Sequence, residues 1–263
     1  GSMGYAIMDS RYAKQVIVAT DNLVPYPCFP VSIEQTNVDY VVQVDSLGDV
    51  NQIASGTTRI TKKPLDLRIA SLAAKVIEHS GFMENGYSFQ VGAGGASLAS
   101  AKYVNEIMQK RRIKGSFLLG GVTSYVVELM QQGLFHSVFD VQSFDAAVSS
   151  SLLNNRSHIE ISSDMYANPF NCGNMVNKLD IVVLGALGVD VNFNVNVVTS
   201  SEGAIMGASG GHCDAAAGTK LAIVACPSFR GRIPTIKRKV NHVVTPGESI
   251  DVVVTERGIC VNP

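Results

Sequence analysis

The chain has 263 residues, of which 46% are hydrophobic and 16% charged, and its 21 Lys and Arg residues balance 22 Asp and Glu residues. This composition excludes a disordered chain and argues against a nucleic-acid partner. The longest apolar run, residues 181–189, is too short to span a bilayer, so we expect a soluble protein without a membrane partner. Residues 1–3 are interpreted as a vector-derived remnant.

Five scattered cysteines, from Cys28 to Cys260, form no CxxC pair. Their number and spacing predict reduced structural thiols and a cytoplasmic location. His212, Cys213 and Asp214 are three possible metal ligands in a row, but adjacent side chains of an extended segment point to different faces. We therefore expect no metal site.

In chain order, prolines interrupt residues 4–40, which we interpret as the tail of a preceding domain or a linker before a domain at residues 41–263. Apolar residues recur at helical spacing over residues 64–77, and Gly81 follows as a C-cap. Strand-like runs at 87–91, 116–119 and 137–141 alternate with helical stretches at 96–111, 125–132 and 145–153. This alternation predicts an α/β fold with a mainly parallel sheet and crossover helices.

The C-terminal part is rich in predicted strands. In residues 189–197, apolar residues alternate with Asp190, Asn192, Asn194 and Asn196, which predicts one strand with a polar face. That face is either solvated or a hydrogen-bonding wall for a polar ligand. Further strands are predicted at Leu221–Ala225, 233–240 and 251–255, with a turn at Pro246.

Two glycine-rich loops, 92–97 and 207–212, follow predicted strands. Glycine lets backbone N–H groups approach a ligand closely, and such donors stabilise an oxyanion or a phosphate. The first loop departs from the dinucleotide fingerprint because Ser97 takes the place of the third glycine, which argues against a dehydrogenase. The second loop contains G-x-S-x-G, so a serine hydrolase with Ser209 as nucleophile and His242 as base remains an alternative.

Several motifs together resemble the citrate lyase α subunit family, and they extend over nearly the whole chain. Each is weak alone, and their combination is specific: 91–98 (VGAGGASL), 140–145 (DVQSFD), 166–169 (YANP), 194–196 (NVN), 207–212 (GASGGH), 230–234 (RGRIP), 245–248 (TPGE) and 254–258 (VTERG). The resemblance covers the C-terminal half of that subunit. It implies a CoA-transferase-like, Rossmann-like domain whose N-terminal partner domain is missing.

The resemblance implies a reaction in which citrate replaces acetate on an acyl carrier protein. The carrier is the γ subunit of citrate lyase, which holds a CoA-like prosthetic group of the phosphoribosyl-dephospho-CoA type, so no cofactor is expected to be bound permanently here. The β subunit then cleaves the citryl thioester. A homo-oligomer is expected within this complex. A citramalate lyase α subunit is an alternative.

The wider CoA-transferases use a glutamate as covalent nucleophile. Gly120, followed by Gly121, stands at the corresponding place, which implies direct attack of citrate on the thioester. Glu202, in a Ser-Glu-Gly sequence, is either a catalytic residue or an exposed turn acid. Gly188 stands where the resemblance leads us to expect a glutamate.

We place the reaction at backbone donors of two glycine pairs, with further side chains lining the substrate. The predicted site residues are Gly94, Gly95, Gly120, Gly121, Asn194, Asn196, Glu202, Gly210, Gly211, His212, Arg230 and Arg232. The two arginines either bind citrate carboxylates or are surface charges. Gly211→Ala is expected to slow transfer while nearly keeping the thermal midpoint.

Low activity is expected of the chain alone, because such transferases are expected to build the site between two related domains. A further alternative is a module that only docks the acidic carrier protein, through the basic residues between 230 and 239.

Overall fold

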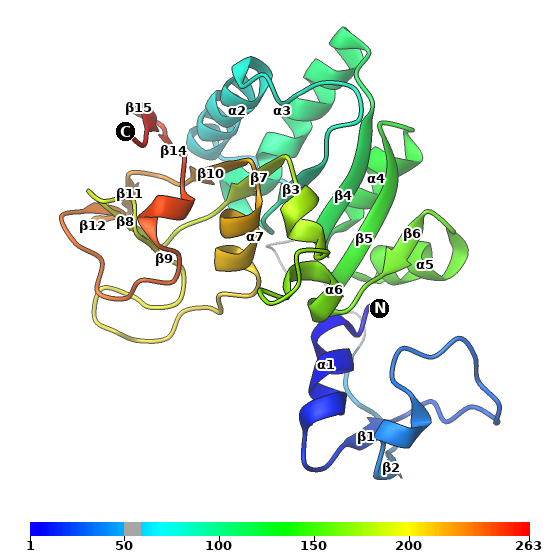
Figure 1. The fold of residues 1–263 in the computed structure, drawn as a ribbon. Helices are drawn as coiled ribbons and strands as arrows, with labels where there is room; N and C mark the ends of the chain where they lie inside the picture. The colour runs from blue at the N-terminus through cyan, green and yellow to red at the C-terminus, as the bar shows by residue number, and fades with distance from the viewer. Residues whose placement is uncertain (50–58) are drawn as a thin grey trace.

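A computed structural model describes residues 1–49 and 59–263. Its main feature is an eight-stranded sheet with the order β15-β14-β10-β7-β3-β4-β5-β6 (Figure 1). Every neighbouring pair is parallel except β14 and β15, which confirms the predicted mainly parallel sheet. The strands are β3 (Phe89–Val91), β4 (Gly115–Val122), β5 (Phe135–Ser143), β6 (His158–Glu160), β7 (Ile181–Leu184), β10 (Leu221–Ala225), β14 (Val252–Thr255) and β15 (Gly258–Val261).

The sheet has a buried core on each face because successive strand side chains point to opposite sides. In β7, Ile181 and Val183 pack in the core beneath α2 (Pro64–His79) and α3 (Gly95–Arg111). Val182 and Leu184 pack in the other core, with α6 (Ser163–Ala167) and α7 (His212–Gly218). The first core also contains residues of α4 (Ser124–Gln131) and α5 (Ala146–Asn154). The four helices predicted between residues 64 and 153 are confirmed.

The single strand predicted for residues 189–197 is wrong. β8 (Gly188–Asp190) and β9 (Val195–Asn196) pair antiparallel as a hairpin. The Asp190 carboxylate accepts hydrogen bonds from the backbone N–H groups of Asn192 at 3.0 Å and Asn194 at 3.1 Å, which folds the chain into a turn. The alternation of polar and apolar residues therefore belongs to a hairpin turn.

The single strand predicted for residues 233–240 is also wrong. β12 (Ile233–Pro234) pairs with β11 (Phe229–Arg230), whereas β13 (Ile236–Lys237) pairs with β8. Thr235 lies between them, and its N–H donates to Ser228 O while its C=O accepts from Val189 N. Pro234 has no N–H to donate, which limits β12 to an edge position.

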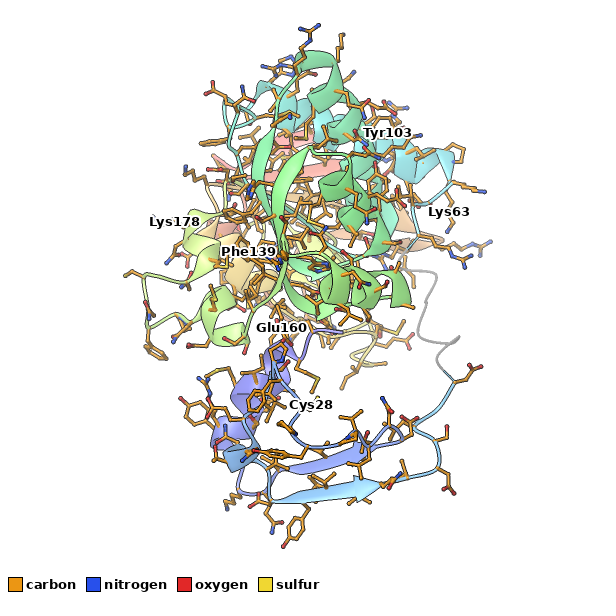
Figure 2. All side chains as sticks on the ribbon, turned by 90° about the vertical axis from the view of Figure 1, so that its right-hand side faces the viewer. Cys28, Lys63, Tyr103, Phe139, Glu160 and Lys178 are labelled. Carbon is orange, nitrogen blue, oxygen red and sulfur yellow. The ribbon has the colours of Figure 1, made fainter. Side chains whose placement is uncertain are left out.

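The N-terminal part contains α1 (Gly4–Tyr12), β1 (Ile17–Thr20), the short 3₁₀ helix η1 (Gln35–Asn37) and β2 (Tyr40–Gln43). β1 and β2 pair in parallel, and Figures 1 and 2 show them beyond α1, apart from the large sheet. α1 itself contacts α6 and β5. A Cβ at Gly4 would lie 1.8 Å from Val141 O, so α1 packs directly on β5. The predicted division near residue 40 stays a prediction.

Candidate functional site

The strand order reverses between β3 and β7. From β3 the chain proceeds to β4, β5 and β6 on one side, and from β7 to β10 and β14 on the other. In open α/β sheets, ligands bind outside the carboxyl ends of the strands at such a switch point. Gly92 follows β3 and Gly185 follows β7, and the Gly92 N–H donates to Val183 O at 2.8 Å. The first glycine loop thus lies at the switch point.

A cleft of about 640 Å³ opens at this place, and we call it the switch-point cleft. Both glycine loops border it, together with side chains from the ends of β3 and β5 and from α1 and α6. Its main lining residues are Tyr5, Gln90, Gly92, Ala93, Gly121, Gln142, Phe144, Tyr166, Gly185, Ala186, Leu187, Gly207, Ala208, Ser209, Gly210, Gly211, His212 and Arg230.

A second cleft, of about 650 Å³, lies beside the first, between α2, the start of α3 and β11. We call it the helix-side cleft. Lys63, which Figure 2 shows at the surface, lines it together with Asp66 and Gly94 to Ser97. The two clefts share four lining residues, Ala93, Gly185, Ala186 and Arg230. A long ligand can therefore extend from one into the other.

The first glycine loop needs glycine for its backbone. Gly94 has φ 82° and Gly95 has φ 53°, in the region that L side chains rarely adopt. The Ser97 hydroxyl donates to Gly94 O at 2.8 Å and so ties the loop to α3. Within the described part of the chain, the N–H groups of Ala93 and Gly94 have no hydrogen-bond partner. They are free to bind a ligand where the clefts meet.

The second glycine loop is held by Tyr166. The Tyr166 hydroxyl accepts from Gln90 Nε2 at 2.9 Å and donates to Gly211 O at 3.4 Å. A Cβ at Gly211 would lie 2.4 Å from Tyr166 Cε1, whereas Gly210 has open space around it and φ 49°. This contact argues against the expectation that Gly211→Ala nearly keeps the thermal midpoint, because the packing of Tyr166 leaves no room for a Cβ at Gly211.

Gln90 forms the floor of the switch-point cleft beside Gly120. Gly120 has φ 102°, and a Cβ there would lie 2.8 Å from Gln90 Cδ. The pairing of β4 with β5 shifts between Gly120 and Gly121, so β4 bends away at this point. Gln90 Oε1 is buried and has no hydrogen-bond partner within the described residues.

Among the described residues, Arg230 is the only one that lines the switch-point cleft and is charged at neutral pH. Its Nη2 donates to Ala186 O at 2.6 Å. His212 is buried, and burial lowers its pKa, so the ring is neutral. Its Nε2 donates to Gly185 O at 2.9 Å and its Nδ1 accepts from Thr245. Burial raises the pKa of Tyr166, and no carboxylate of residues 1–49 or 59–263 lines this cleft. The site thus offers one cation and neutral donors.

Asn194 and Asn196, predicted to line the substrate, line neither cleft. Asn194 Nδ2 contacts the Asp190 carboxylate, and its Oδ1 accepts from Gly247 N at 3.0 Å. Asn196 Nδ2 donates to Thr199 O at 2.9 Å. Both side chains stabilise the hairpin and the loop after it. Their contact with substrate stays a prediction.

Glu202 and Arg232 are exposed and also line neither cleft. Glu202 lies in a turn, and its catalytic role stays a prediction. Ser209 and His242 are both exposed, and no hydrogen bond joins them in the described part of the chain, so the geometry gives the hydrolase alternative no support. Among the described residues, no group of three or more His, Cys, Asp or Glu could hold a metal ion. Likewise, none of the described helices is long and apolar enough to cross a membrane.

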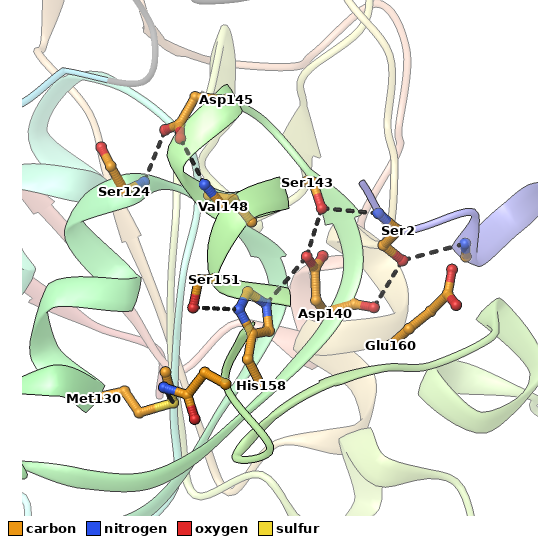
Figure 3. Close-up of polar contacts among 12 residues, drawn as sticks. Ser2, Ser124, Met130, Asp140, Ser143, Asp145, Val148, Ser151, His158 and Glu160 are labelled. Atoms are coloured by element: carbon orange, nitrogen blue, oxygen red, sulfur yellow. Dashed lines mark hydrogen bonds and ion pairs between the residues drawn. The ribbon is translucent and has the colours of Figure 1, made fainter. Parts of the chain in front are cut away.

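A buried polar cluster fixes the end of β5, and the sequence reasoning missed it (Figure 3). Asp140 Oδ2 accepts from Ser143 Oγ at 2.6 Å and lies 3.3 Å from His158 Nε2. His158 Nδ1 lies 3.0 Å from Ser151 Oγ, and Ser2 Oγ donates to Asp140 O. Gln142 lies in β5 and Phe144 directly after it, so this cluster helps to position a wall of the switch-point cleft.

The protein family described as "Citrate lyase, alpha subunit (CitF)" matches residues 1–263. The chain belongs to this family. The citrate lyase alpha chain of Escherichia coli K12 is 50% identical over 263 residues, which are all of this chain and 52% of the relative. That of Haemophilus influenzae is 48% identical, with 53% of the relative covered. The chain thus spans about half the length of the curated citrate lyase relatives that it matches.

Solved structures agree with the family. The putative citrate lyase alpha subunit of Streptococcus mutans, crystallised in complex with citrate, matches with TM-score 0.95 and 55% identity, over 100% of this chain and 52% of that chain. The malonate decarboxylase alpha subunit of Acinetobacter baumannii has TM-score 0.75 at 17% identity, over 99% of this chain and 56% of that one, and supports the fold alone. The predicted CoA-transferase-like α/β fold and the predicted citrate lyase family are confirmed.

Proposed function

We propose that this chain carries half of an acyl-thioester transferase site, at which citrate replaces acetate on the acyl carrier subunit of citrate lyase. The charge of the switch-point cleft carries the proposal: of the residues that the structure describes, Arg230 is the only charged one that lines it, and none of its lining residues is a carboxylate. Such a cleft attracts an anionic substrate. A relative crystallised with citrate supports the choice of anion.

In the proposed reaction, a citrate carboxylate oxygen attacks the carbonyl carbon of the acetyl thioester. The C–S bond breaks, which gives a citryl–acetyl anhydride and a thiolate, and the thiolate then attacks the citryl carbonyl and releases acetate. No proton has to move, in agreement with a neutral His212 whose ring nitrogens are both hydrogen-bonded. The N–H groups of Ala93 and Gly94 would stabilise the negative charge that develops on the carbonyl oxygen.

The helix-side cleft is proposed to receive the CoA-like arm of the γ acyl carrier subunit. Lys63 can pair with a phosphate group there, and the thioester end would reach the residues shared with the switch-point cleft. The arm is a substrate that arrives with its carrier, so we propose no permanently bound cofactor.

We further propose that the chain acts in the cytoplasm, in a homo-oligomer with the β and γ subunits. Because it spans about half of its relatives' length, the other half is proposed to supply the rest of the site. The chain alone should therefore transfer acyl groups slowly, and adding the missing half in trans should restore part of the rate.

The test uses the full-length subunit, acetyl carrier protein and citrate, with mass spectrometry of the carrier and measurement of released acetate. The expected product is citryl carrier protein. Arg230→Gln should lower kcat/KM for citrate by roughly 10–100-fold, because a hydrogen bond to a charged group contributes about 1.5–3 kcal/mol. The control Arg156→Gln, at an exposed arginine that lines neither cleft, should change it little. An unchanged carrier mass would refute the proposal, and product from citramalate but not citrate would favour the citramalate alternative.

A further inference from the structure

Residues 215–247 contain six basic residues and no acidic one. This asymmetry is local, because the whole chain has 21 basic and 22 acidic residues. Lys220 is set apart, since it pairs with Asp180 at 2.7 Å. The other five lie between residues 230 and 239, the segment that forms β11, β12 and β13.

One group of exposed cations and exposed apolar side chains comes from this segment and from Arg257, which contacts Phe229. We call it the basic face and define it by Phe229, Arg230, Arg232, Ile233, Ile236, Arg238, Lys239 and Arg257, all of which are exposed. The guanidinium of Arg257, from the turn between β14 and β15, lies 6.0 Å from the centre of the Phe229 ring and joins the charges to the apolar part. In Figure 1, β11 and β12 lie on the same side of the molecule as β14 and β15.

Asp66 lines the helix-side cleft with Phe229 and Arg230, and two further carboxylates, Glu256 and Glu202, lie beside the basic face. Glu256 accepts hydrogen bonds from the Ser228 N–H and hydroxyl, and it contacts Arg257 at 3.5 Å. Glu202 lies in the exposed turn next to Ser201, whose hydroxyl accepts from Lys237 Nζ. The Glu256 carboxylate thus binds groups of the chain itself, and Glu202 lies at the edge of the basic face. Most of the positive charge faces outward.

The basic face leads directly to the two clefts, because Arg230 belongs to it and lines both. A partner bound there would have its reactive group within reach of the candidate site. Exposed apolar side chains within a cationic rim fit a protein surface of opposite charge, since charge complementarity steers association and apolar contacts hold the complex. The chain's net charge of −1 argues against a general polyanion-binding surface.

We propose that the basic face docks the acidic surface of the acyl carrier subunit and so directs its arm into the helix-side cleft. This inference rests on the proposed transferase function for the identity of the carrier. It names which part of the chain the carrier contacts, and it assigns this docking above all to Arg238 and Lys239, which line neither cleft.

The test compares two double variants of matched charge change. The double variant Arg238→Glu and Lys239→Glu alters the basic face. The control, Lys110→Glu with Lys114→Glu, alters two exposed lysines at and just beyond the C-terminal end of α3, whereas the N-terminal end of α3 borders the helix-side cleft. Binding of purified carrier protein is measured at two salt concentrations with the chain described here. The first variant should bind about tenfold or more weakly at low salt and lose most of the salt dependence, whereas the second should bind like the unaltered chain.

The same pairs in the full-length subunit separate docking from chemistry. With carrier-bound thioester, kcat/KM should fall about tenfold for the basic-face variant, and with the free thioester arm it should stay unchanged. Equal carrier binding by both variants would overturn the docking proposal, as would binding of anionic vesicles in preference to the carrier. If carrier binds as expected and the unaltered enzyme transfers no acyl group, the docking surface stands and the transferase proposal fails.

Discussion

Replacing Gly211 by alanine tests whether Tyr166 joins the two glycine loops. The added Cβ would lie 2.4 Å from Tyr166 Cε1 and 2.7 Å from its hydroxyl oxygen. Because the ring is 2% exposed, it cannot swing into solvent. Overpacking of this kind costs about 1–3 kcal/mol. Loss of the hydrogen bond between Tyr166 and Gln90 adds about 0.5–1.5 kcal/mol.

The expected total of about 1.5–4.5 kcal/mol should lower the thermal midpoint by roughly 3–18 °C, because each kcal/mol shifts the midpoint of a domain of this size by about 2–4 °C. Calorimetry of the purified chain measures this directly. Gly210→Ala is the matched control: a Cβ there meets open space, and φ 49° costs about 1–2 kcal/mol for alanine.

A double-mutant cycle identifies the cause. In a Tyr166→Leu background the ring is gone, so the added cost of Gly211→Ala should fall to a few tenths of a kcal/mol. Two results would refute the reasoning: an unchanged midpoint for the single variant, or the full cost of Gly211→Ala in the Tyr166→Leu background. Either would show that the second loop is not packed on Tyr166.

Three further predictions follow from the site. Glu202→Gln should leave kcat of the full-length subunit within about twofold, and hydroxylamine trapping should find no acyl-enzyme, because Glu202 is exposed and lines neither cleft. The free energy of unfolding should fall as pH drops below 6.5, because His212 takes up a proton there in the unfolded chain, whereas burial keeps it neutral to lower pH in the folded chain. Denaturant titrations of His212→Gln should show a weaker dependence on pH. Asp190→Asn should lower the free energy of unfolding by about 2–3 kcal/mol, measured by chemical denaturation. Burial opposes ionisation of Asp190, but the hydrogen bonds that it accepts from Val240, Asn192 and Asn194 outweigh this and hold its pKa below the usual value.

The strands and helices between residues 64 and 153 could be predicted because the local sequence pattern there agrees with the burial of each residue in the folded chain. Buried strands are continuous apolar runs, and α2 carries its apolar residues at helical spacing. The pattern failed at residues 189–197 because a two-residue period also fits a turn in which Asp190 binds the N–H groups of Asn192 and Asn194. Phe193 then adopts φ 63°, which no apolar pattern predicts.

The candidate site was predicted only in part. Both glycine loops line the switch-point cleft, as their composition indicated, and Arg230 joins them. Gln90 and Tyr166 were missed because their pairing joins residues 76 positions apart, which spacing along the chain cannot show. A polar residue inside the buried run of β3 was the available signal, since a buried side-chain amide requires partners.

The floor of the cleft links the proposed mechanism to packing. A glutamate at position 120 would need φ 102° and the space that the Gln90 side chain occupies, so removing one glycine would not by itself restore a covalent nucleophile. Gln90 is in turn held by Tyr166, which contacts the second glycine loop. The contacts that exclude an enzyme carboxylate from this position are therefore the same ones that position the second loop. Under the proposed reaction, the nucleophile must come from citrate itself, and the loops have only to orient the thioester and stabilise its oxyanion.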